Sequence, residues 1–378
     1  MGNAEALVSV IKHQFTESTR GDTMKHPSRT EKIGRSRHAT LVRATLLGLL
    51  AAGLAPAGAL AATPFDAGVN PSIANGLGGL VEVHQAYDVS TGYTPLWYSV
   101  GTPQFTSSVV NWSRSYAYDH GVDPSVASGG IRVPGSLIGD PAVVEVHQAV
   151  VGSPTSPVAL WYRVGTPCGG SSCPQPIVWG ASQIYDTGLN PSVAFNYPAG
   201  GDGSIVEVHQ GQGNALWYRV GKVSLSDDTI AWGPSIYFDA GYHPNVAVYG
   251  DTVVEVHQAY QTDPSALWYS VGTLSTQTMT ITWSQSHLYD NGSSPAISFD
   301  GSDIKEVHQG APGAVWTDIG TLTPDATTIN FVGQNYDSGT HPGVAVFPSC
   351  SGPDSVEVQQ AGNTLTYDAY LTSCPPPH

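Results

Sequence analysis

The sequence predicts an all-β fold, a six-bladed β-propeller of four-stranded blades. A strand-like segment, Val206 to Gln210, is followed by an aromatic one, Leu216 to Gly221, and this pair recurs along the chain. The composition, with 43 Gly and 28 Pro among 378 residues and only 12% charged side chains, is typical of short strands joined by turns. Repetition of one unit indicates an architecture in which each copy covers the apolar face of its neighbour.

The number of blades follows from one position of the repeat. Its glutamate recurs in steps of 63, 62, 48, 51 and 51 residues, as Glu82, Glu145, Glu207, Glu255, Glu306 and Glu357. Loop insertions at Ser128 to Pro141 and at Thr166 to Pro176 account for the long steps. Six units are therefore predicted, enough to close a ring without open sheet edges.

Each unit is expected to contain four strands. In the third unit the first is Asn190 to Ala194, whose small side chains suit a crowded central axis. Val206 to Gln210 is the second, with its valines on one face and its Glu and His on the other, because strand side chains alternate. Leu216 to Val220 is the third, and Thr229 to Gly241 forms the fourth and the turn to the next unit.

The two ends of the repeat region predict how the ring closes. The last unit stops after its third strand, at Leu371, whereas Pro64 to Ala74 matches the end of a fourth strand followed by a first strand. We expect the mature N-terminus to complete the last blade, so that the propeller extends over residues 62–378.

Residues 1–61 are predicted to be a basic leader and a secretory signal peptide. An apolar run, Ala44 to Ala55, follows a Lys/Arg-rich stretch and precedes the small-residue tripeptide Ala59 to Ala61. We expect cleavage near Ala61 and a secreted protein, with no membrane span in the mature chain; an uncleaved anchor is the alternative. The charged stretch is long, and Met24 is a second candidate start.

The four cysteines agree with an oxidising compartment. Cys168 and Cys173 share one loop, and Cys350 and Cys374 lie near the end of the chain. We expect both pairs to form disulfides. A zinc site is the alternative, but tight Cys/His ligand spacing is missing from the sequence.

The charge distribution excludes two kinds of partner. Of the 14 basic and 30 acidic residues, 8 and 4 precede Thr63, which leaves 6 basic against 26 acidic residues and a charge of −20 in the repeats. Such a field repels phosphate backbones and anionic lipid headgroups, so neither nucleic acid nor a membrane surface is expected as a partner.

The order of these strands, from the small-residue Ser-Val-Ala strand to the Trp-Gly strand, resembles the six-bladed fungal fucose-binding lectins over Phe65 to Leu371. The resemblance implies sugar sites between adjacent blades. In that family the second strand brings an arginine that binds the sugar. The matching positions in this chain are Glu82, Glu145, Glu207, Glu255, Lys305 or Glu306, and Val356 or Glu357, depending on register. The resemblance therefore implies a sugar-binding propeller but not fucose.

The repeated polar and aromatic residues allow two interpretations. The Glu/His pairs of the second strands either lock blade to blade as a buried polar network or face a ligand groove. The tryptophans of the third strands either pack the blades or offer a ring face to a sugar, beside an arginine in two copies. The candidate ligand-binding residues are Glu145, Trp161, Arg163, Glu207, His209, Trp217, Arg219, Glu255 and Trp268.

The sequence predicts no enzyme, cofactor or metal site. A sialidase would need several arginines converging on a carboxylate, but the mature chain has only Arg114, Arg132, Arg163 and Arg219. Another glycosidase would need two carboxylates in distinct environments, whereas the repeat places its acids equivalently. The segment Asp119 to Asp123 could be mistaken for a calcium loop, and we interpret it as a turn.

We therefore predict a secreted, multivalent, lectin-like propeller that binds glycans or glycoconjugates and catalyses nothing. The first alternative is an extracellular protein-interaction scaffold that uses the loops Gly129 to Asp140 and Pro167 to Pro176. The second is a hydrolase that acts on glycans.

Overall fold

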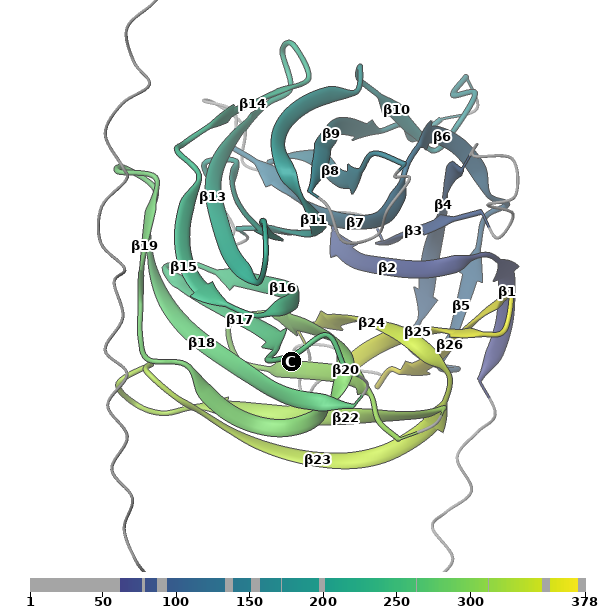
Figure 1. The fold of residues 1–378 in the computed structure, drawn as a ribbon. Coiled ribbons are helices and arrows are strands. Elements are labelled where there is room, and N and C mark those ends of the chain that lie inside the picture. Colours follow the sequence, from purple (N-terminus) through teal and green to yellow (C-terminus); the bar gives the residue numbers. More distant parts are fainter. Residues whose placement is uncertain are drawn as a thin grey trace, which may run out of the picture. The chain divides into compact units, whose positions relative to one another are not determined.

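A computed structural model describes residues 62–76, 79–86, 94–132, 139–150, 157–170, 172–196, 201–262, 264–311, 313–348 and 354–372. These residues form 26 strands and the turns between them (Figure 1). The predicted leader, residues 1–61, lies outside the described residues. Over the part of the chain that is described, no helix is long and apolar enough to cross a membrane.

Among the described strands, one antiparallel arrangement, in which a first strand pairs with a second and the second with a third, recurs six times, and we call each occurrence a copy. The first strands are β2 (Val69–Gly76), β7 (Val122–Ile131), β11 (Gln183–Phe195), β16 (Tyr242–Tyr249), β20 (His287–Phe299) and β24 (Thr340–Phe347). The second strands are β3 (Gly79–Gln85), β8 (Asp140–Gln148), β12 (Ser204–Gln210), β17 (Thr252–Gln258), β21 (Ile304–Gln309) and β25 (Asp354–Ala361). The third strands are β4 (Pro95–Gln104), β9 (Val158–Pro167), β13 (Ala215–Ser224), β18 (Ser265–Ser275), β22 (Ala314–Leu322) and β26 (Thr364–Tyr370). We number the copies 1 to 6 in this order.

The fourth strand is split in most copies. In copy 1 it consists of β5 (Val109–Trp112) and β6 (Tyr116–His120). In copy 3 it consists of β14 (Thr229–Trp232) and β15 (Ile236–Ala240). In copies 2 and 4 it consists of β10 (Ile177–Trp179) and β19 (Thr280–Trp283) with the first halves of β11 and β20, which then continue as the first strands of the following copies. Copy 5 ends in a single strand, β23 (Ile329–Ser338).

The N-terminal strand belongs to the last copy. β1 (Thr63–Ala67) pairs antiparallel with β26, with Thr63 opposite Tyr367, so copy 6 takes its fourth strand from the other end of the repeat region. The first strands pack side by side in the order β2, β7, β11, β16, β20 and β24, and β24 in turn packs against β2 (Figure 1).

Each sheet is buried on both faces, which explains why its second strand combines valines with a polar pair. In β12, Val206 and Val208 lie in one apolar cluster with Val246 and Val248 of the next copy. Glu207 and His209 point to the opposite face and are equally buried. Alternation along the strand therefore gives each copy one apolar and one polar contact face.

A tyrosine of the third strand joins neighbouring copies. The Tyr218 hydroxyl accepts a hydrogen bond of 3.0 Å from the Ile281 backbone nitrogen and donates one of 3.2 Å to the Ile281 carbonyl oxygen. Tyr367 makes the same pair of contacts with Val110 and so joins copy 6 to copy 1. Because each hydroxyl is both donor and acceptor, it satisfies two backbone groups at the apolar face.

The repeated Asp-x-Gly segment also has a packing reason. A Cβ atom on Gly188 would lie 2.6 Å from Cδ2 of His209 and 2.9 Å from the Gln210 carbonyl oxygen. The chain that enters copy 3 therefore passes so close to the buried histidine that only glycine fits.

Candidate functional site

Each of the six first strands contains a residue in an unusual backbone conformation directly before a proline. These residues have φ between 47° and 52° and are Asn70, Asp123, Asn190, His243, Ser294 and His341. A positive φ is uncommon for residues other than glycine, and such strain is concentrated at functional sites. We call these six residues the ring position.

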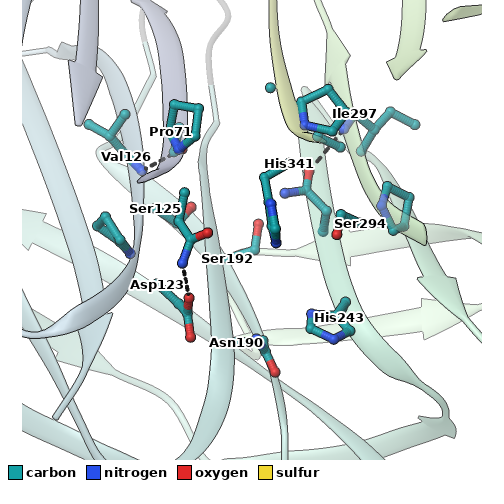
Figure 2. A pocket seen from close by; sticks show the side chains of 18 of the residues that line it. Pro71, Asp123, Ser125, Val126, Asn190, Ser192, His243, Ser294, Ile297 and His341 are labelled. Carbon is teal, nitrogen blue, oxygen red and sulfur yellow. Dashed lines mark hydrogen bonds between the residues drawn. The ribbon is translucent and has the colours of Figure 1, made fainter. Parts of the chain in front are cut away.

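The six residues of the ring position line one pocket of about 180 Å³ (Figure 2). This space would hold on the order of ten water molecules or one small ligand. A girdle of aliphatic side chains forms its inner end and also borders a second pocket of about 230 Å³, which is lined by the later parts of the same strands. The girdle consists of Ile73, Val126, Val193, Val246, Ile297 and Val344.

Small polar side chains of the pocket wall join the first strands to one another. The Ser72 hydroxyl accepts a hydrogen bond of 3.2 Å from the Val126 backbone nitrogen, and Oδ1 of Asn245 accepts one of 2.9 Å from the Ile297 backbone nitrogen (Figure 2). These contacts link adjacent copies directly, so the wall of the pocket is held by the same bonds that hold the copies together.

The last residue of the second strand fixes the ring position of the next copy. Oε1 of Gln148 accepts a hydrogen bond of 2.8 Å from the backbone nitrogen of Asn190, and Oε1 of Gln258 accepts one of 2.9 Å from that of Ser294. In these two copies the glutamine therefore stabilises the strained backbone through the main chain, without using the side chain of Asn190 or Ser294.

Asp123 is the carboxylate of the ring position. Its Oδ1 accepts a hydrogen bond of 2.6 Å from Nδ2 of Asn70 (Figure 2). Because burial disfavours the charged form, the pKa of Asp123 is raised to about 6 despite that bond. A carboxyl group with this pKa can donate or accept a proton near neutral pH.

The same pocket holds two histidines. Burial, together with the neighbouring His341, lowers the pKa of His243 to about 4. His243 is therefore a neutral imidazole at physiological pH, with one nitrogen able to accept a hydrogen bond and the other able to donate one. Among the described residues that line this pocket there is no Arg and no Lys.

The Glu/His pairs predicted as ligand residues lie away from this pocket. Glu145, Glu207 and Glu255 have no exposed surface, and each is 3.1 to 3.2 Å from Nδ1 of the histidine two residues later. Tyr185 donates a further hydrogen bond of 2.9 Å to Glu207. Burial alone would lower the pKa of His209, but the neighbouring Glu207 carboxylate raises it above the usual value.

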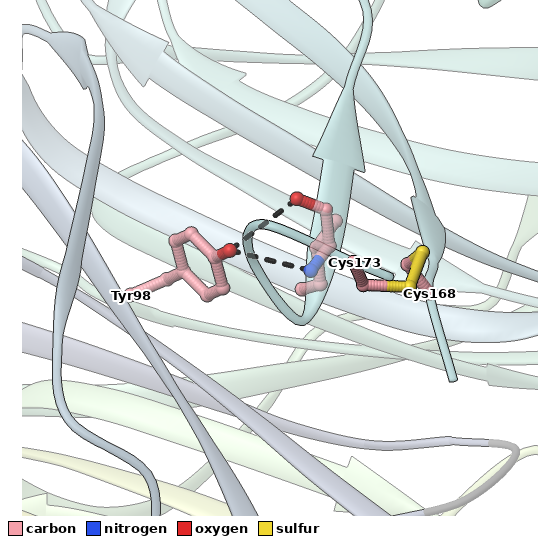
Figure 3. Close-up of a disulfide and its surroundings, with 4 residues drawn as sticks. Tyr98, Cys168 and Cys173 are labelled. Atoms are coloured by element: carbon pink, nitrogen blue, oxygen red, sulfur yellow. Dashed lines mark hydrogen bonds between the residues drawn. A yellow bond between two sulfur atoms is a disulfide. The ribbon is translucent and has the colours of Figure 1, made fainter. Parts of the chain in front are cut away.

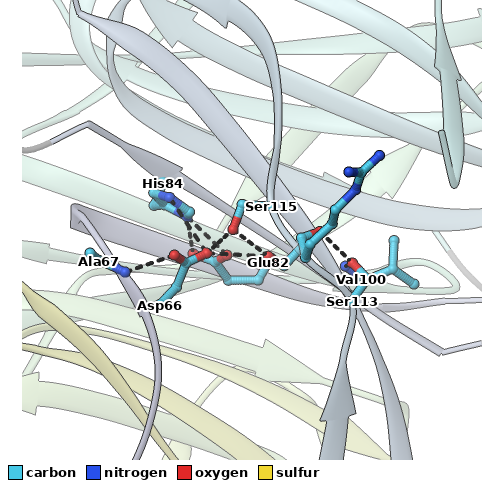
Figure 4. Close-up of polar contacts among 9 residues, drawn as sticks. Asp66, Ala67, Glu82, His84, Val100, Ser113 and Ser115 are labelled. Carbon is cyan, nitrogen blue, oxygen red and sulfur yellow. Dashed lines mark hydrogen bonds and ion pairs between the residues drawn. The ribbon is translucent and has the colours of Figure 1, made fainter.

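Copy 1 shows how these pairs reach the preceding copy. Nε2 of His84 is 3.9 Å from Oδ2 of Asp66 in β1, and its Nδ1 is 3.1 Å from Glu82 (Figure 4). The Ser115 hydroxyl also donates to Asp66. The pair is thus part of a polar network between copies, as the structural interpretation expects.

The predicted tryptophans and arginines of the third strands are cross-strand neighbours of these pairs. Trp161, Trp217 and Trp268 are partly buried, opposite the histidines of their own copies. Nε of Arg163 is 2.9 Å from Oδ2 of Asp119, and Nη1 of Arg219 is 3.4 Å from Oδ2 of Asp186. Both arginines therefore form ion pairs between copies, and none of the nine predicted residues lines either pocket. Ligand binding by them stays a prediction.

The structure contains the Cys168–Cys173 disulfide, with the Cα atoms 5.9 Å apart (Figure 3). The loop that it closes leads into β10, where the Tyr98 hydroxyl bonds to the backbone of Ile177. Cys350 and Cys374 lie outside the described residues.

Sequence reasoning missed the ring position. An Asn, Asp, His or Ser that precedes a proline and lies two residues after a glycine has the composition of a turn. The segment Asp119 to Asp123 is interpreted as a turn on this ground. The available signal was that this residue changes from copy to copy while the proline after it is constant.

Comparison with known proteins places the fold. The chain is similar to a sialidase from Trypanosoma rangeli, at a TM-score of 0.53 and 11% identity over 83% of this chain and 58% of that one. It is also similar to the NanB sialidase from Streptococcus pneumoniae, at a TM-score of 0.54 and 7% identity over 83% of this chain and 69% of that one. An α-L-arabinanase from Penicillium chrysogenum matches at a TM-score of 0.49 and 11% identity over 82% of this chain and 98% of that one. No family model and no curated protein sequence matches the chain.

These likenesses establish an all-β fold of the kind found in β-propeller glycosidases. The chain spans 58% of the length of the trypanosomal sialidase. The predicted resemblance to fungal fucose-binding lectins is wrong, and so are the predictions of a lectin and of a chain without catalytic activity, because the proteins that share this fold here are glycoside hydrolases. Those predictions were based on a strand pattern that indicates only the architecture. Binding proteins and enzymes share this architecture, so the pattern does not distinguish between them.

Proposed function

We propose that this chain is a secreted, glycan-acting hydrolase, built as a six-bladed propeller that β1 closes, with its active site in the pocket of the ring position. The antiparallel unit and the pairing of β1 with β26 support the blade number and the closure. The Cys168–Cys173 disulfide and the apolar run Ala44 to Ala55 support secretion.

One observation carries the proposal, which is the position and chemistry of Asp123. It is the carboxyl group at the ring position, and burial raises its pKa to about 6, so that it is partly protonated near neutral pH. In glycoside hydrolysis a protonated carboxyl group donates its proton to the oxygen of the leaving group. Asp123 takes this role, and the neutral His243 accepts a proton or a hydrogen bond from the attacking water.

The lining residues also limit the substrate. The similar structures are sialidases, whose substrate carries a carboxylate, yet the described lining of this pocket has no Arg or Lys to bind one. Arg163 and Arg219 are held by Asp119 and Asp186 instead. The proposed substrate is therefore a neutral glycan, of which one sugar unit enters a space of about 180 Å³.

The test compares turnover of chromogenic neutral glycosides and sialosides by the full-length chain. Neutral glycosides should be hydrolysed and sialosides should not, and Asp123→Asn should lower kcat by a factor of about 10² to 10⁴. Asp227→Asn is the matched control, because Asp227 lies in the exposed turn between β13 and β14 and should keep full activity. Turnover that survives Asp123→Asn, or no turnover of any neutral glycoside, would contradict the proposal.

A further inference from the structure

One position of the third strand differs between copies in its charge. It is held by Ser99, Arg163, Arg219 and Ser270 in copies 1 to 4, by Asp318 in copy 5 and by Asp368 in copy 6. In copies 2 and 3 its arginine forms an ion pair with the aspartate of the preceding copy, at 2.9 Å and 3.4 Å. Copy 5 replaces that cation with a third carboxylate.

The resulting cluster has the composition of a metal site. Asp290, His308 and Asp318 each offer one ligand atom, and these atoms lie within 4.8 Å of one another. Oδ2 of Asp290 is 3.8 Å from Nε2 of His308, whereas the 3.6 Å contact of Asp318 Oδ2 is to the other ring nitrogen, Nδ1. Separations of this size need only a small inward shift to give metal bonds of about 2.0 to 2.2 Å.

An independent observation concerns one carboxylate oxygen of the cluster. The Asp318 side chain is only 4% exposed, and its Oδ2 has no hydrogen-bond donor. A buried carboxylate oxygen without a donor is destabilising, and here it faces two further acids, Asp290 and Glu306.

We propose that Asp290, His308 and Asp318 bind a divalent transition-metal ion, for which Zn²⁺ is the probe. Nδ1 of His308 is 3.0 Å from Glu306, whose other oxygen accepts a hydrogen bond of 2.8 Å from Tyr289. A proton on Nδ1 donated to Glu306 leaves Nε2 as the metal ligand, an arrangement in which a carboxylate orients the histidine. One imidazole and two carboxylates favour Zn²⁺ or Mn²⁺ over Ca²⁺ and Mg²⁺.

The geometry also provides access. The Asp290 side chain is 37% exposed, so the ion can enter from solvent and keep water as its remaining ligand. The metal would occupy the place that the guanidinium of Arg163 or Arg219 takes in copies 2 and 3. Because this cluster lies at the contact of copies 4 and 5 and lines neither pocket, its metal binding is separate from the proposed chemistry at Asp123.

The experiment titrates the full-length chain, stripped of metal, with Zn²⁺ in a calorimeter and measures the bound zinc after dialysis. Asp318→Ser installs the residue that copies 1 and 4 already carry, so the fold should persist. We expect it to remove one zinc equivalent, or to weaken that site about 100-fold or more, while Glu306→Gln weakens it about 10-fold.

A gain-of-site variant is the matched control. Ser270→Asp places a carboxylate beside Asp239 and His257 in copy 4, and it should add a second zinc equivalent. The proposal is overturned if the wild-type chain binds no Zn²⁺, if folded Asp318→Ser binds as much as the wild type, or if Ca²⁺ binds in an Asp318-dependent way and Zn²⁺ does not.

Discussion

The buried Glu/His pairs and the ring position are both repeated around the molecule, but they differ in how constant their side chains are. The glutamate occurs in all six copies. The histidine occurs in five of them, and copy 6 has Gln359 at that position. The ring position keeps one backbone conformation, yet its side chain is Asn, Asp, His or Ser. A side chain that every copy keeps is one that the fold requires, whereas a side chain that the copies change is available for function.

The two regions also differ in what their polar groups contact. The glutamates bond to protein groups on the contact face between copies and have no exposed surface. The residues at the ring position share a pocket, and their backbone is held by glutamines of the preceding copy. Substitutions at the two kinds of position should therefore separate stability from activity.

The largest loss of stability is expected from Glu207→Ala. It leaves His209 and the Tyr185 hydroxyl buried without their partner, and breaking such a buried pair costs about 3 to 5 kcal/mol. This loss is measured as the change in the free energy of unfolding, obtained by urea titration of both chains. Glu207→Gln keeps an acceptor for Tyr185 and should lose less; equal losses in the two variants would show that the hydrogen bonds are not what the fold needs.

Asp123→Asn should raise the free energy of unfolding, whereas Glu207→Ala lowers it. The folded-state pKa of about 6 lies above the usual value of 3.8, so the penalty of ionising Asp123 develops between these two pH values and is complete above the higher one. The variant should be more stable than the wild type by about 2 to 3 kcal/mol at pH 8 and should match it at pH 3.5. Thermal unfolding at the two pH values tests this, and equal stability at pH 8 would mean that Asp123 is not desolvated.

Tyr218→Phe probes the apolar side of the contact between copies 3 and 4. The change leaves the Ile281 backbone nitrogen and carbonyl oxygen without their partner, so the free energy of unfolding should fall by about 1 to 3 kcal/mol. Urea titration is again the measurement. Because the tyrosine lies outside the pocket, turnover per folded molecule should not change; a parallel fall in kcat would indicate coupling between the two regions.

Ser294→Ala should have the smallest effect on stability, within about 0.5 kcal/mol. The change removes only a hydroxyl group that faces the pocket, and the backbone bond from Ser294 to Gln258 remains. An effect confined to KM would place this side chain in substrate binding. A loss of stability like that of Tyr218→Phe would erase the distinction between the ring position and the buried pairs.

Much of the fold could be predicted from the sequence, because the repeat carries it. The alternation within Val206 to Gln210 indicated a strand with two different faces, and the match of Pro64 to Ala74 with a fourth and a first strand located the pairing of β1 with the last copy. Each prediction depended on comparing a short segment with the other copies of the repeat. The lectin prediction failed because that strand pattern carries no information on the chemistry of the site.

The candidate site could not be predicted in this way, because it is assembled from residues far apart in the sequence. Asp123 and His243 come together only when the first strands of different copies pack side by side, and neither has a motif around it. The pKa of Asp123 is likewise set by burial. For Asp318, the same repeat position is Ser or Arg in copies 1 to 4, and its role in a metal site depends on Asp290 of the preceding copy.

The most direct test of the proposed active site is the pH dependence of kcat/KM for a neutral glycoside. If Asp123 is the proton donor, kcat/KM should fall as pH rises through about 6, because the donor is lost when the carboxyl group ionises. Asp123→Asn should show no such limb and only residual turnover. A profile that stays flat from about pH 5 to pH 8, or a limb that persists in Asp123→Asn, would contradict the assignment of this pocket as the active site.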